Sequence, residues 1–167
     1  FHMAHLVESK GWSLTDFTET YFLYTAVLGA VSLFTGPLVD RVGAVRLLPY
    51  YMIPRGLARL AIAGSDHPGA AAIYRLASGV AVGLRVTSGG AVWAEIYGTR
   101  HLGAVRALAV SVMVFSSAIG PAITGLLIDA GITLERQGIV MMLWCFGLSA
   151  IFVLVARRLR LLVATPA

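Results

Sequence analysis

Charge is what this sequence has least of. Charged residues make up 13% of the 167 residues, whereas a soluble domain usually carries about 25%. Residues 20–39 and 138–156 contain no charged residue at all. This shortage excludes an ordinary water-soluble domain.

Cysteine and lysine are equally rare, because each occurs once, as Cys145 and Lys10. A single cysteine excludes a disulfide framework within the chain. The net charge of +5 comes from arginines, and these form no stripe interleaved with aromatic residues, so we expect no nucleic-acid partner.

Long apolar stretches fill most of the remaining chain, which is 58% hydrophobic with a mean hydropathy of +0.83. A helix needs about 20 residues to cross the hydrocarbon layer of a bilayer. Backbone groups in lipid must be satisfied within the segment, and the alternation expected of barrel strands is absent. The sequence therefore predicts an all-α integral membrane protein with spans at residues 20–39, 44–63, 68–93, 104–130 and 138–156.

The basic residues predict the orientation of these spans. One set of loops and the C-terminal tail carry Arg41, Arg46, Arg100, Arg106, Arg157, Arg158 and Arg160, whereas the opposite loops carry Lys10 and Arg136. Positive residues accumulate on the cytoplasmic side. We therefore expect a multi-pass protein of the cell (plasma or inner) membrane, with residues 36–46, residues 93–106 and the C-terminus in the cytoplasm.

The first residues, FHMAHL, look like the end of an apolar helix that is too short to span a membrane. We expect a fragment with five complete transmembrane helices and the end of a sixth. Such a fragment would be the C-terminal half of a larger protein and would lack its N-terminal half.

The segment GPLVDRVGAVR at residues 36–46 places an acid, two arginines and three turn-forming residues between two apolar stretches. It resembles the loop signature of the major facilitator superfamily through Gly36, Asp40, Arg41, Gly43 and Arg46. Residues 93–131 resemble the tenth-to-eleventh helix region of that superfamily. Residues 1–13 resemble the outer end of the seventh helix in monocarboxylate-type and related bacterial members. The resemblance implies that the spans are helices eight to twelve of twelve.

The same resemblance implies a gate. In this family the loop arginine pairs with an acid on a neighbouring helix in one conformational state, and Glu95 is the available acid. Asp40, Arg41 and Glu95 are therefore predicted to form a cytoplasmic latch that breaks when the transporter changes its facing side.

Arginines inside spans are the candidates for substrate binding, because a charge in the membrane usually faces protein or a water-filled cavity. Arg85 shares a helix face with Ser78 and Ser88, and a guanidinium can hold a carboxylate with two parallel hydrogen bonds. The alternative for Arg85 is a buried pairing or snorkelling toward the cytoplasm. Snorkelling is favoured for Arg75, and pairing or interfacial anchoring for Arg55 and Arg59.

Three polar residues near the start of the chain complete the predicted substrate site. Tyr21 and Thr25 could line the cavity opposite Arg85, although bonding back to their own helix is an equally good reading. His5 could contribute near the outer end of the cavity. Residues 20–39 lack the aspartate-arginine pair that couples proton and substrate in monocarboxylate carriers, which places that coupling in doubt.

These features favour a secondary active transporter of a small solute that works by alternating access, with an organic anion such as a monocarboxylate as the candidate substrate class. The alternatives are a membrane-embedded enzyme and a structural or assembly subunit. We found no converging set of catalytic residues, and we expect no cofactor and no metal. The expected partners are the substrate, the lipid bilayer and the missing N-terminal half.

Overall fold

The structure is a computed structural model that describes residues 3–163. Within that range the chain forms helices and no strand, which agrees with the expected all-helical architecture. The helices are α1 (Met3–Ser9), α2 (Leu14–Val42), α3 (Ala44–Leu47), α4 (Met52–Gly64), α5 (Gly69–Tyr97), α6 (Leu102–Asp129) and α7 (Leu134–Val163).

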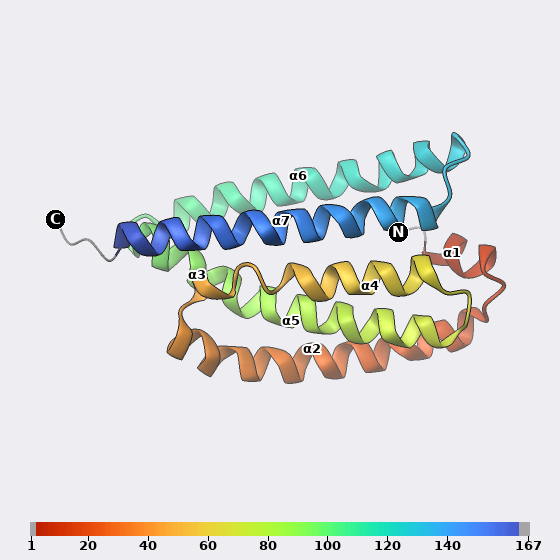
Figure 1. The fold of residues 1–167 in the computed structure, drawn as a ribbon, viewed down its shortest axis with the longest axis horizontal. Coiled ribbons are helices and arrows are strands. Elements are labelled where there is room, and N and C mark those ends of the chain that lie inside the picture. Colours follow the sequence, from red (N-terminus) through yellow and green to blue (C-terminus); the bar gives the residue numbers. More distant parts are fainter. Residues whose placement is uncertain (1–2, 164–167) are drawn as a thin grey trace.

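The long helices run side by side, with α2 along one edge of the bundle and α6 along the opposite edge (Figure 1). α5 is the central element, because it packs against both α2 and α4, and α4 in turn packs against α7. α6 makes few contacts with the rest, and none of its residues is buried. One long face of α6 is therefore free of contacts from the described part of the chain.

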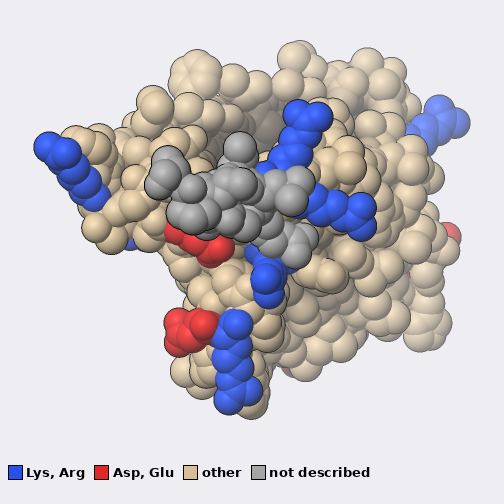
Figure 2. Space-filling view, turned by 60° about the vertical axis from the view of Figure 1, so that its left-hand side comes forward, with Lys and Arg blue, Asp and Glu red and all other residues tan. Residues whose placement is uncertain are grey.

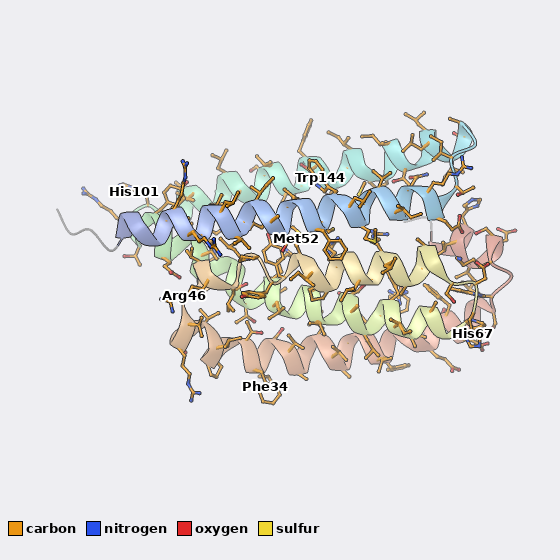
Figure 3. All side chains as sticks on the ribbon, viewed as in Figure 1. Phe34, Arg46, Met52, His67, His101 and Trp144 are labelled. Carbon is orange, nitrogen blue, oxygen red and sulfur yellow. The ribbon has the colours of Figure 1, made fainter. Side chains whose placement is uncertain are left out.

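Three helices, α2, α6 and residues Leu134–Leu159 of α7, are long and apolar enough to cross a membrane. Large apolar side chains on them point outward: Phe34 on α2 is 80% exposed and Trp144 on α7 is 65% exposed. Figure 3 shows Phe34 projecting away from the bundle. An exposed apolar surface of this extent suits contact with lipid rather than water.

The second predicted span is not one continuous helix. The structure divides residues 44–63 into α3 and a 13-residue α4, separated by turns at residues 48–51. Pro49 explains the break, because it has no amide hydrogen to donate to the carbonyl four residues earlier. Its own carbonyl accepts a 2.7 Å hydrogen bond from Ser149 Oγ on α7. The expectation of one continuous helix over these residues was therefore wrong.

The close approach of α2 and α5 depends on glycine. A Cβ atom at Gly79 would lie 2.9 Å from the Tyr24 carbonyl oxygen, and one at Gly83 would lie 2.9 Å from Val31 Cβ. Both distances are shorter than van der Waals contact, so neither position tolerates a side chain without movement. The G-x-x-x-G spacing on α5 thus lets the two backbones meet.

The loops expected on the outer side meet at one end of the bundle. Lys10 Nζ lies 2.6 Å from Asp66 Oδ1 and 3.7 Å from Glu135 Oε1, and its side chain is only 2% exposed. Trp12 Nε1 donates to the Asp66 carbonyl oxygen at 2.7 Å. Lys10 therefore joins the α1–α2 and α4–α5 connections to the first turn of α7.

The opposite end of the bundle is basic. Figure 2 shows arginine side chains gathered around the end of the bundle at which α7 ends. Arg46 and His101 lie at this end, whereas His67 lies at the other (Figure 3). The two ends therefore differ in charge, while the side of the membrane that each end faces stays a prediction.

Replacing Gly83 with alanine should destabilise the bundle by about 1–3 kcal/mol, because the added methyl overpacks the α2–α5 contact. Thermal unfolding in detergent, followed by the reaction of a thiol-specific dye with buried Cys145, measures the effect. Gly89→Ala is the matched control, since nothing lies within 4 Å of its Cβ position. The control should unfold at the same or a higher temperature because alanine favours helix by about 1 kcal/mol. Equal behaviour of the two variants would contradict the packing argument.

Candidate functional site

The central helix α5 carries Arg75 and three of the six residues predicted to bind substrate, Ser78, Arg85 and Ser88. Arg75 and Arg85 are ten positions apart on it, which corresponds to about 15 Å along the axis at 1.5 Å per residue. The two arginines therefore occupy different depths of the bundle and cannot act on the same small group together.

Arg85 is exposed. Together with Arg55 it lies close enough to Tyr51 to interact electrostatically with its hydroxyl. Tyr51 stands before α4 and its ring lies 6.0 Å from that of Phe152 on α7. Arg85 is therefore on the side of α5 that faces the start of α4.

The two serines predicted to share a helix face with Arg85 differ in their exposure. Ser78 is half-buried, whereas Ser88 is 4% exposed and donates to the Leu84 carbonyl oxygen at 2.6 Å. A serine that bonds to its own helix has used its donor. Ser78 and Arg85 remain the accessible members of this face.

Tyr21 and Thr25 are not brought to Arg85. Thr25 Oγ1 donates to the Tyr21 carbonyl oxygen at 2.9 Å, which is the back-bonding alternative considered above. The Tyr21 ring instead lies over Arg75, with 3.5 Å between the ring centroid and Arg75 Cζ. The structure thus joins Tyr21 to the other arginine of α5.

Arg75 is buried, with 6% of its surface exposed, although snorkelling was the expectation for it. Its Cζ lies 4.6 Å from the Phe17 ring centroid and 5.5 Å from that of Tyr74. Phe17 and Tyr21 are four residues apart on α2 and therefore present one aromatic face to α5. That spacing was visible in the sequence, but the pairing of α2 with α5 was not.

His5 lies on α1 and is exposed, while its neighbours Leu6 and Val7 are buried against the bundle. Leu6 packs with Ala58, Ile62 and Tyr74. The short helix is thus held by its apolar residues, and His5 faces away from them. His2 lies outside the described residues.

A cavity of about 450 Å³ opens between α4, α6 and α7. Arg55 and Arg59 line it from α4, Pro121 from α6, and Gln137 from α7. Sequence reasoning favoured pairing or interfacial anchoring for these two arginines. Within the described range the ion pairs are those of Lys10, so Arg55 and Arg59 have no carboxylate partner there.

At the basic end, Glu95 is joined to the start of α3. Its Oε2 accepts hydrogen bonds from the backbone amides of Ala44 at 2.7 Å and Val45 at 3.2 Å. Gly43, with φ +89°, ends α2 and leaves room for the carboxylate, since a Cβ there would lie 3.1 Å from Oε1. The Glu95 side chain therefore holds the loop at residues 36–46 against α5 by accepting hydrogen bonds from backbone amides of that loop.

Asp40 and Arg41 are exposed in the last turn of α2. In this conformation, and among the described residues, Glu95 forms no ion pair with Arg41. The structure brings the loop and Glu95 together but shows a backbone contact where an ion pair was expected. The gating role of the trio remains a prediction.

A family model described as Major Facilitator Superfamily matches residues 1–166. The chain belongs to the major facilitator superfamily. No curated protein and no solved structure matches it. The superfamily is one of membrane transporters, so this finding confirms the resemblance drawn from the loop motif. The likeness to monocarboxylate-type members stays an expectation.

The contact of Glu95 with α3 leads to a prediction about local exchange. Glu95→Gln should accelerate hydrogen exchange of the Ala44 and Val45 amides at least tenfold, because a charge-assisted bond contributes about 1.5–3 kcal/mol. Peptide-level exchange measured by mass spectrometry over residues 43–48 reports it. Arg41→Gln should leave these amides unchanged. Equal acceleration in both variants would indicate an Arg41–Glu95 ion pair instead.

Proposed function

We propose that this chain is part of a secondary active transporter that moves a small solute across the cell membrane by alternating access. Membership of the superfamily over residues 1–166 carries the proposal. The mechanism requires two bundles that rock about a central site. We propose that an N-terminal half supplies the second bundle, and the contact-free face of α6 supports this by offering a surface for it.

We propose an organic anion, such as a monocarboxylate, as the substrate class. The support is electrostatic: arginines outnumber acids in the bundle, and Arg85 is exposed on the central helix with half-buried Ser78 two turns away. A guanidinium on such a surface has donors free for a carboxylate. Arg85 and Ser78 would therefore take part in binding, while Ser88 would support the helix.

The loop at residues 36–46 would act as the gate at the cytoplasmic side. The support is the contact of Glu95 with the start of α3, which shows that the acid already reaches the loop. In a second conformation Glu95 would exchange its backbone partners for Arg41. This exchange keeps the carboxylate satisfied in both states and so allows two arrangements of similar energy.

Counter-flow in proteoliposomes tests the transport function. The full-length protein, preloaded with unlabelled lactate or benzoate, should accumulate the labelled anion in a saturable way. Arg85→Gln should lower the initial rate at least tenfold, because one bidentate contact is worth more than about 1.4 kcal/mol. Exposed Arg100→Gln is the matched control for loss of one positive charge. Absence of flux across a broad panel of organic anions would exclude this substrate class.

Charge exchange tests the gate. Arg41→Glu and Glu95→Arg should each reduce transport, and the double variant should recover at least part of the lost rate because the pair is restored with reversed sign. The initial rates of the four proteins form a double-mutant cycle. Additive losses without recovery would rule out the pairing of Arg41 with Glu95 in the transport cycle.

A further inference from the structure

Arg75 is a buried cation without a hydrogen-bond partner. Nε and Nη2 of its guanidinium are both buried and unpaired, and the side chain is 6% exposed. Within the described range the ion pairs are those of Lys10, so no protein carboxylate neutralises Arg75 there. A buried charge normally acquires a partner, since an unmade bond to it costs free energy.

The aromatic cluster of Phe17, Tyr21 and Tyr74 offsets only part of this cost. Tyr21 lies at 3.5 Å from Arg75 Cζ, Phe17 at 4.6 Å and Tyr74 at 5.5 Å. A cation–π contact contributes about 0.5–2 kcal/mol. Leaving two buried donors unpaired costs about 1–3 kcal/mol each, and more for charged groups. The rings hold the guanidinium but do not satisfy its N–H groups.

The two unpaired atoms are adjacent and define the class of ligand. Nε and Nη2 lie along one edge of the planar guanidinium, and their N–H bonds point in parallel. A carboxylate accepts such a pair of hydrogen bonds with its two oxygens. The aromatic rings contact the guanidinium without accepting hydrogen bonds from Nε or Nη2, so both donors stay unpaired.

We propose that Arg75 is a carboxylate-binding site, in which the Nε–Nη2 edge holds the anion and the aromatic cluster packs against an apolar part of the same ligand. The single cation suits a monoanion, and the surrounding Phe17 and Tyr21 rings suit an apolar body. The site is separate from Arg85, about 15 Å farther along α5. The choice of an organic monoanion as the ligand rests on the proposed function. The site itself requires only that this ligand binds, not that the protein transports it.

The site lies near one end of the bundle. Arg75 is six residues from the start of α5, about 9 Å along the helix, near the end where Lys10 forms its ion pairs. Tyr21 is 45% exposed, so the aromatic cluster reaches the surface of the described bundle. The Nε–Nη2 edge itself is buried, so a ligand reaches it only when a covering side chain moves.

Thermal stabilisation of the full-length protein in detergent tests the site, with benzoate as the probe and benzamide as its neutral analogue. Benzoate should raise the unfolding temperature in a saturable way, and benzamide should not. Arg75→Lys keeps the charge over the aromatic cluster but loses the two-nitrogen edge, so its Kd for benzoate should rise at least tenfold. Arg136→Gln, an exposed change at the same end of the bundle, should bind as wild type does.

Failure of benzoate to stabilise the wild-type protein, or an unchanged Kd in Arg75→Lys, would overturn the proposal.

These outcomes can be told apart from failure of the transport function. Saturable benzoate binding that depends on Arg75, without counter-flow of any anion, would retain the site and remove the transport proposal. Counter-flow of organic anions, with benzoate binding unaffected by Arg75→Lys, would retain the transport proposal and remove the site.

Discussion

The close approach of α2 and α5 is the contact on which the rest of the structure depends. Gly79 and Gly83 let the backbones meet, and nearly every feature of the chain is positioned from α5. Phe17 and Tyr21 reach Arg75 only because α2 lies this close. In lipid, where apolar side chains gain little by leaving the solvent, such packing between small residues is a main source of helix association.

The few charges inside this apolar chain are treated in three different ways. Lys10 forms ion pairs with Asp66 and Glu135 and donates to the Ser65 carbonyl oxygen, so it holds one end of the bundle together. Glu95 accepts hydrogen bonds from two backbone amides at the start of a short helix, so its charge is satisfied without a cation. Arg75 lies among aromatic rings with two buried nitrogens unpaired. Two of these charges therefore have partners within the described chain, and the third has only the rings.

The helices of this chain could be predicted from the sequence, but the contacts of Arg75 and Tyr21 could not. Helical character was predictable because apolar length and the need to satisfy backbone groups leave no alternative in lipid. The break at Pro49 was missed because the stretch from 44 to 63 is long enough for one span and is apolar apart from Arg46, Arg55 and Arg59. The proline itself was a sufficient signal. Snorkelling was expected of Arg75 because the sequence did not reveal which helix would cover it. The placement of Tyr21 on that arginine could not be obtained from periodicity for the same reason.

The sequence by itself determined the class of the protein, its helices, the basic end of the bundle and its superfamily, because these depend on composition, on local periodicity and on motif order along the chain. The tertiary structure decided which polar groups meet. It placed Glu95 on the amides of α3 and Arg75 among three aromatic rings. These contacts depend on which helices pair and on the rotation of each helix about its axis. Packing between residues distant in the sequence sets both, and local sequence does not.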